Sequence, residues 1–103
     1  MTSSIYIDIE DIKKANADIG RHWFDAETMA YFNSYVYQKV YFGRFFITSE
    51  QDEHGAWEGQ RRYTVRECID GEIHTTSEFG EFDTFKQAQS FARQVGAYHE
   101  ALR

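Results

Sequence analysis

The stretch that decides the fold is Val40-Tyr41-Phe42-Gly43-Arg44-Phe45-Phe46-Ile47-Thr48, and two runs of the same kind follow it at residues 61–69 and 73–79. All three runs are rich in aromatic and β-branched residues, which suit the half-buried surface of a pleated sheet. A polar connection at residues 51–60 and an Asp70-Gly71 dipeptide separate the runs. The pattern predicts a three-stranded antiparallel meander in the middle of the chain.

The Asp70-Gly71 dipeptide is a strong hairpin signal that leaves two strand registers open. A two-residue turn would pair Cys68 with Ile73 and place Val65 on the opposite face of the sheet. A three-residue loop, with Gly71 left-handed, would place Val65 and Ile73 on one face. We expect the three-residue loop, because it gathers the apolar residues on one buried face. The other face, expected to be polar and wet, would carry Thr64, Arg66, Cys68, His74, Thr76 and Glu78.

Helical patterns flank the predicted sheet on both sides. Asp8 is expected to cap a helix with apolar residues at three- and four-residue spacing, which ends at Gly20. Asp25 is expected to begin a shorter second helix. Thr84 and Gln87 fit a capping box before a long amphipathic helix. The predicted fold is a two-layer α+β domain in which helices cover a three-stranded antiparallel β-meander, in the order α-α-β-β-β-α.

Length and composition limit the class of protein. The chain has 103 residues, enough for one compact core, so we expect a single globular domain over residues 1–103. No apolar run approaches the roughly 20 residues that cross a bilayer, and the N-terminus lacks the basic and apolar segments of a secretory signal. The single cysteine, Cys68, excludes an internal disulfide. We therefore expect a cytoplasmic protein that does not bind a membrane.

The net charge of −6 is concentrated in the middle of the chain. Residues 50–83 carry ten acids and three arginines, a net charge of −7, whereas residues 1–49 carry −1 and residues 84–103 carry +2. Arginines beside an aromatic residue, as at residues 61–66, can form a platform for nucleic-acid bases, but the surrounding acids repel phosphate. The charge therefore predicts a basic protein partner and no direct binding of nucleic acid.

Aromatic residues are in surplus, at 17% of the chain. A core of this size does not easily enclose nine Phe, seven Tyr and two Trp side chains. We expect Tyr35, Tyr37, Tyr41 and Trp57 to be partly exposed, where they would supply the rigid contact area typical of binding hot spots. The alternative is that these rings line the edge of the core with their polar ends in water.

The residues that could carry chemistry lack the necessary patterns. The four histidines and Cys68 do not have the spacing of zinc ligands. Cys68 and His74 could pair as nucleophile and base across two strands, but nothing indicates an oxyanion hole. Carboxylate pairs such as Glu78 and Glu81 lie in polar connections, where general acids rarely lie. We expect no catalytic residue, no metal site and no cofactor, and an enzyme that uses Cys68 and His74 is an alternative.

Five runs of the chain carry a family likeness. They are Ile12-Lys13-Lys14-Ala15-Asn16, Gly20-Arg21-His22-Trp23-Phe24, Thr28-Met29-Ala30-Tyr31-Phe32-Asn33-Ser34, Arg44-Phe45-Phe46-Ile47-Thr48-Ser49-Glu50 and Arg61-Arg62-Tyr63-Thr64-Val65-Arg66. Over most of the chain, the sequence resembles a family of short proteins of unknown function from phages, prophages and other mobile elements. The resemblance implies a mobile-element context, in which small acidic proteins often disable host defence machinery, including CRISPR effectors.

These observations together predict a non-enzymatic inhibitor of the anti-CRISPR type. It would bind a basic surface of a host protein or ribonucleoprotein effector, in the bacterial cytoplasm, through an acidic and aromatic face. The expected contact residues are Tyr35, Tyr37, Tyr41, Glu50, Asp52, Glu53, Trp57, Glu58, Glu78 and Glu81. The alternative function is a self-associating structural or regulatory module, with the aromatic edge forming a homodimer.

Overall fold

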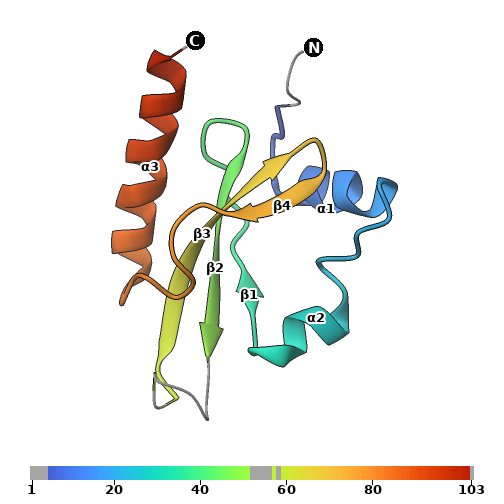
Figure 1. Cartoon of the computed structure of the whole chain (residues 1–103), viewed down its shortest axis with the longest axis vertical. Coiled ribbons are helices and arrows are strands. Elements are labelled where there is room, and N and C mark those ends of the chain that lie inside the picture. Colours follow the sequence, from blue (N-terminus) through green and yellow to red (C-terminus); the bar gives the residue numbers. More distant parts are fainter. Residues whose placement is uncertain (1–4, 52–56, 58, 103) are drawn as a thin grey trace.

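The computed structural model describes residues 5–51, 57 and 59–102. The elements in chain order are α1 (Ile9–Asp18), α2 (Ala26–Tyr31), β1 (Tyr35–Val36), β2 (Phe45–Gln51), β3 (Arg61–Ile69), β4 (Glu72–Thr75) and α3 (Phe85–Ala101). The strands form one antiparallel sheet in the order β1-β2-β3-β4 (Figure 1). The α+β class and the antiparallel meander are confirmed, but the sheet has four strands rather than three.

The additional strand, β1, lies at one edge of the sheet. It consists only of Tyr35 and Val36, which pair with Ser49 and Thr48 of β2. Two residues are too few to show the alternation by which a strand is recognised in a sequence. The element order is therefore α-α-β-β-β-β-α.

The helices at the two ends of the chain cover opposite faces of the sheet (Figure 1), so the expected two-layer arrangement is wrong. On one face, Phe45 and Val65 pack with Ala88 and Ala92 of α3. On the other face, a second core cluster joins α1 to the sheet; it consists of Tyr6, Ile9, Ile12, Phe46 and Cys68. Consecutive apolar residues in β2 point alternately to the two faces, as in strands that are buried on both sides.

The β3–β4 hairpin has the two-residue turn, so the expected three-residue loop is wrong. Cys68 pairs with Ile73, and the turn residues Asp70 and Gly71 have φ angles of 50° and 88°. Positive φ at both central residues is the geometry of a type I′ turn, which favours this dipeptide. Burial did not select the register, because both faces of the sheet are covered.

The face that was expected to be wet is largely core. Thr64, Arg66 and Cys68 are buried, whereas His74 and Glu78 are exposed. The polar residues of β3 are buried because the segment between β4 and α3 folds back over them. This segment, residues 76–84, is called the β4–α3 loop below.

Two of the three helix caps expected from the sequence are formed by side chains, whereas Asp25 precedes α2 without a side-chain cap hydrogen bond. The side chain of Asp8 accepts a hydrogen bond from the backbone N–H of Asp11 at the start of α1. The hydroxyl of Thr84 accepts one from the backbone N–H of Gln87 at the start of α3. The Gln87 side chain reaches back to the N–H of Asp83 rather than to that of Thr84, so the reciprocal bond of the capping box is shifted by one residue.

The hairpin turn docks directly on α1. Asn16 of α1 is buried and donates a hydrogen bond of 2.9 Å to the carbonyl of Gly71. The same side chain accepts one of 2.8 Å from the backbone N–H of Trp23. A β-carbon at Gly71 would lie 2.6 Å from the carbonyl oxygen of Ala15. The turn therefore needs glycine for both its backbone angle and its close approach to the helix.

Replacement of Gly71 by alanine should destabilise the protein more than replacement of Gly20, which has a similar φ angle but open space at the position that a β-carbon would take. Gly71→Ala and Gly20→Ala both introduce a left-handed alanine, at φ of 88° and 75°, which costs about 1–2 kcal/mol. Only Gly71→Ala also forces α1 away from the turn, because nothing lies within 4 Å of the new β-carbon at Gly20. Urea denaturation should show the larger loss for Gly71→Ala, and equal losses would contradict the direct docking.

Candidate functional site

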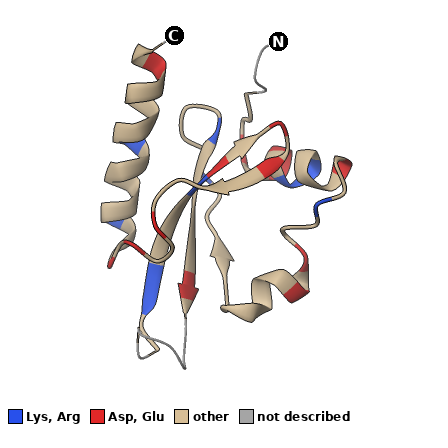
Figure 2. Ribbon diagram, in the orientation of Figure 1, with Lys and Arg blue, Asp and Glu red and all other residues tan. Residues whose placement is uncertain are grey.

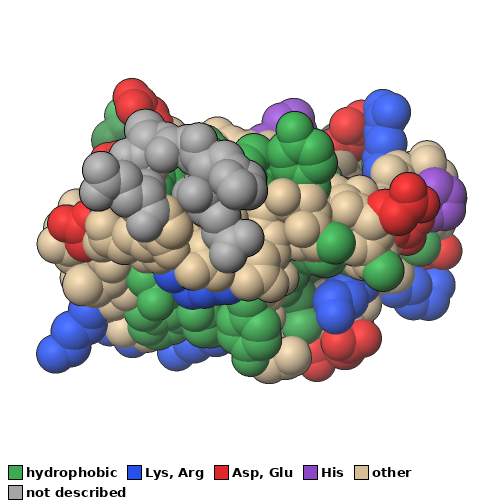
Figure 3. Space-filling view, turned by 90° about the horizontal axis from the view of Figure 1, so that it is seen from below, with side chains coloured by type: hydrophobic (Ala, Val, Ile, Leu, Met, Phe, Trp, Pro, Cys, Tyr) green, Lys and Arg blue, Asp and Glu red, His purple; other side chains and the backbone are tan. Residues whose placement is uncertain are grey.

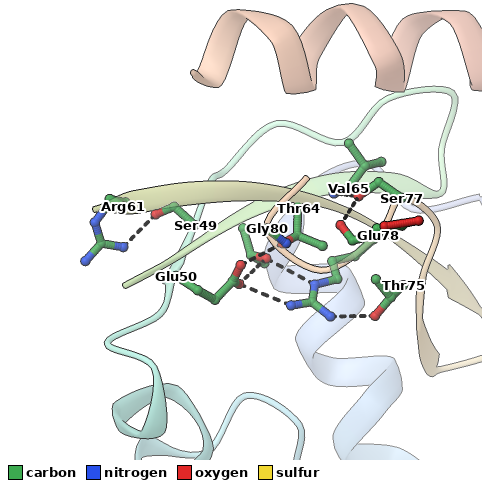
Figure 4. A network of polar contacts seen from close by, with 11 residues as sticks. Ser49, Glu50, Arg61, Thr64, Val65, Thr75, Ser77, Glu78 and Gly80 are labelled. Atoms are coloured by element: carbon green, nitrogen blue, oxygen red, sulfur yellow. Dashed lines mark hydrogen bonds and ion pairs between the residues drawn. The ribbon is translucent and has the colours of Figure 1, made fainter. Parts of the chain in front are cut away.

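A buried ion pair joins β2 to β3. Glu50, at 1% exposure, and Arg66, at 7%, belong to these neighbouring strands and face the side of the sheet that α1 covers. The Glu50 carboxylate accepts hydrogen bonds of 3.1 Å from Arg66 Nη2, 2.5 Å from the Thr48 hydroxyl and 2.7 Å from the Thr64 hydroxyl (Figure 4). Removing both charges from water is costly, and the two threonines supply the additional hydrogen bonds that such a pair needs.

The polar network around the ion pair also holds the end of β4 and the β4–α3 loop. Arg66 Nη1 donates a bond of 2.6 Å to the hydroxyl of Thr75, and the backbone N–H of Gly80 donates one of 2.8 Å to the hydroxyl of Thr64 (Figure 4). Arg62 holds the same loop from outside, by donating to the carbonyl of Gly80. The loop is therefore fixed against the sheet by polar contacts rather than by apolar packing alone.

The guanidinium of Arg66 lies between two aromatic rings. Its central carbon is 5.2 Å from the ring centroid of Trp23 and 5.6 Å from that of Phe79. Burial lowers the pKa of this group, and the Glu50 carboxylate acts in the opposite direction. The positive charge is held in the interior by one carboxylate and two ring faces.

Four aromatic rings form a continuous series that begins at the surface and passes over the buried Arg66 at Phe79. Successive centroids are 4.7 Å apart for Tyr31 and Phe32, 5.1 Å for Phe32 and Phe79, and 5.2 Å for Phe79 and Trp57. Tyr31 is 80% exposed and Phe79 is 41% exposed, whereas Phe32 and Trp57 are half-buried. We call these four residues the aromatic row.

The aromatic row is fixed on its inner side and open on its outer side. The ring of Trp57 covers Gly80 so closely that a β-carbon there would lie 2.1 Å from it. Three exposed acids lie near the row in the chain: Glu27 one helical turn before Tyr31, Glu78 beside Phe79, and Glu81 within the same loop. Figure 3 shows patches of hydrophobic side chains among charged ones at this end of the molecule. The arrangement suits contact with another macromolecule.

The predicted contact residues fall into separate groups. Trp57 is in the aromatic row, and Glu78 and Glu81 are exposed close to it in the chain. Tyr35 is 54% exposed, but its ring contacts Tyr37, which packs on Phe85 of α3 on the other side of the sheet.

The remaining predicted contact residues are buried or lie outside the described residues. Tyr41 is 4% exposed, so the expectation that it is partly exposed is wrong; its ring is part of the core that α3 covers. Glu50 is buried as well and is not available to a partner. Asp52, Glu53 and Glu58 lie outside the described residues.

Three residues of the aromatic row were missed by the sequence analysis. Phe32 belongs to the apolar pattern that follows Asp25, Tyr31 was assigned no role, and Phe79 was assigned to a strand. No local pattern connects these positions, because the row is assembled from three segments far apart in the chain. Glu50 could not be recognised as buried, because its cation, Arg66, is on the next strand.

Cys68 and His74 lie on opposite faces of the sheet, because Cys68 pairs with Ile73 and His74 with Glu67. This geometry excludes a nucleophile–base pair between them. Burial raises the pKa of the Cys68 thiol, so the reactive thiolate is disfavoured.

In the part of the chain that the structure describes, no three side chains of His, Cys, Asp or Glu are grouped to hold a metal ion. Within the same residues, no helix has the length and apolar character needed to cross a membrane.

Comparison with known proteins gives one match. The profile of a family described as a family of unknown function, DUF7447, matches residues 8–93. The matched span includes all four strands and every member of the aromatic row. No curated protein and no solved structure matches the chain.

Removal of the buried cation should destabilise the fold strongly. Arg66→Met keeps apolar volume between Trp23 and Phe79 but leaves Glu50 buried without its cation, which costs about 3–5 kcal/mol. Arg21→Met, which breaks an exposed ion pair with Glu72, should cost less than about 1 kcal/mol. Urea denaturation followed by tryptophan fluorescence compares the two. Adding Glu50→Gln to Arg66→Met should recover part of the loss, and a further loss would contradict the assignment of the pair.

The buried thiol should react slowly in the folded protein. Because the pKa of Cys68 is raised, little thiolate is present at neutral pH, and alkylation by iodoacetamide should become fast only in denaturant. The unfolded chain loses this proton first as pH rises, so stability should decrease above the ordinary thiol pKa of about 8.5. Mass spectrometry measures the alkylation rate. Rapid alkylation of the native protein at neutral pH would contradict the placement of Cys68.

Proposed function

The chain belongs to this family of unknown function, and we propose that it acts as a non-enzymatic inhibitor that binds another protein. The proposed partner is a host protein or ribonucleoprotein effector, of the CRISPR type, that presents a basic surface. The resemblance to mobile-element proteins supports the biological context. The observation that carries the proposal is the aromatic row, with unpaired acids close to it.

The aromatic row has the properties of a binding hot spot. Aromatic residues supply large contact area with few rotatable bonds, and they dominate the energetics of many protein interfaces. The inner sides of Phe79 and Trp57 already rest on Arg66 and Gly80. Little conformational freedom would be lost when a partner covers the outer sides. A rigid, partly exposed apolar strip is typical of interaction surfaces.

The local charge favours a basic partner. Glu50, Glu67, Glu72 and Asp83 are each paired with an arginine of this chain, so part of the acidic excess is neutralised internally. Figure 2 shows that acidic and basic positions are interspersed along the described ribbon. By contrast, Glu27, Glu78 and Glu81 form no ion pair with any described residue. Exposed carboxylates that lack an ion pair would attract lysine and arginine side chains and would repel phosphate.

Binding to purified effector complexes should depend on this surface. Tyr31→Ala is expected to weaken binding by about 2 kcal/mol, as for an aromatic hot spot. Glu78→Lys should weaken binding most at low salt, where charge attraction is least screened. Asp18→Lys is a matched control, because Asp18 is an exposed acid at the end of α1. Pull-down of each effector at rising salt compares these variants.

Two outcomes would count against the proposal. Equal retention of an effector by Tyr31→Ala, Glu78→Lys and the native chain would show that the aromatic row is not the contact surface. Light scattering provides the second outcome: a dimer that Tyr31→Ala converts to a monomer would assign the row to self-association instead.

A further inference from the structure

We infer that the outer end of the aromatic row is a pocket for a single arginine side chain of the partner. The pocket has a volume of about 370 Å³ and is lined by Glu27, Thr28, Tyr31 and Phe32. This inference rests on the proposed protein-binding function, and it names the chemistry by which that surface would recognise its partner.

The pocket is built on one short helix that is tied to the sheet. Glu27 and Tyr31 are four residues apart on α2, so they lie on the same side of the helix, and Phe32 is the residue that follows its last turn. The rings of Tyr31 and Phe32 meet edge to face, at an interplanar angle of 71°. The pocket therefore combines two aromatic rings with one carboxylate and one hydroxyl.

The end of α2 that carries these rings is held by β2 and β3. The carbonyl of Phe32 accepts a hydrogen bond of 2.7 Å from the backbone N–H of Gln51. The carbonyl of Asn33 accepts one of 2.9 Å from Arg61, and the Asn33 side chain donates one of 3.0 Å to the Gln51 side chain. Phe32 also packs against Phe79. These contacts fix one wall of the pocket before any partner arrives.

The chemistry of the lining selects a cation. The faces of aromatic rings attract positive charge, and the carboxylate of Glu27 is exposed and makes no hydrogen bond or ion pair with a described residue. The planar guanidinium of arginine suits this combination better than the ammonium of lysine, because it can stack on a ring and donate two hydrogen bonds to a carboxylate.

The interior of the same protein contains a similar group of two aromatic rings and one carboxylate, and there an arginine of the chain itself occupies it. Arg66 lies between the rings of Trp23 and Phe79 and donates to the carboxylate of Glu50. The α2 pocket presents two rings and a carboxylate without a cation from any described residue. We therefore assign to the partner the arginine that would complete it.

The experiment titrates the ¹⁵N-labelled native chain with N-acetyl-arginine amide and follows backbone amide and tyrosine ring signals by NMR. We expect saturable shifts at residues 27–32. N-acetyl-citrulline amide, which has nearly the same shape but no charge, should give no saturable shift. Glu27→Gln should abolish the shifts seen with arginine. Glu10→Gln, which alters an exposed acid on α1, should retain them.

The outcomes separate this inference from the proposed function. Any of three results would overturn the pocket assignment: absence of saturable shifts with arginine, equal shifts with citrulline, or retained shifts in Glu27→Gln. The effector pull-down with Tyr31→Ala would still test the aromatic row. Saturable, charge-dependent shifts together with unchanged effector binding by Glu27→Gln would support the pocket chemistry and contradict its use by that effector.

Discussion

The buried pair of Glu50 and Arg66 is the interaction on which the arrangement of this domain depends. Two charges in the interior are tolerated only when each is well paired and hydrogen-bonded, and here the remaining acceptors of the carboxylate are filled by Thr48 and Thr64. The polar network around the pair also includes Thr75 at the end of β4 and the backbone N–H of Gly80, and the bond from Gly80 holds the β4–α3 loop over the sheet. A face that would otherwise be wet is thereby converted into core.

This pair also changes how the charge of the sequence is interpreted. The net charge of −7 over residues 50–83 indicated a broad acidic surface. In the structure, four of those acids are paired with arginines of the same chain, and Glu50 is buried. Only Glu27, Glu78 and Glu81 lie near the aromatic row in the chain without an ion pair to a described residue, so the charge favours a localised contact with a small number of basic side chains.

The sequence predicted those features that local chemistry determines. Asp8 and Thr84 cap their helices, and three of the strands lie where β-branched and aromatic residues are concentrated. The errors came from long-range packing. The apolar run Phe45-Phe46-Ile47 already indicated burial on both faces, but the register at Asp70-Gly71 was chosen as if one face were wet. The aromatic row had no signal in the sequence, because its rings meet only after three distant segments fold together.

The surface and the core of this protein are physically continuous. The ring of Phe79 contacts the buried guanidinium of Arg66 on one side, contacts Trp57 and Phe32, and is partly exposed to solvent. The position of Phe79 in the proposed binding surface is therefore tied to the buried ion pair. The network also holds the β4–α3 loop at Gly80, so a change in the ion pair would displace the aromatic row through Phe79 and Gly80. Tyr31 is positioned separately, by the hydrogen bonds that Gln51 and Arg61 donate to the end of α2. Recognition by the row would then depend on two separately anchored halves, one fixed by the buried charges and one by the edge of the sheet.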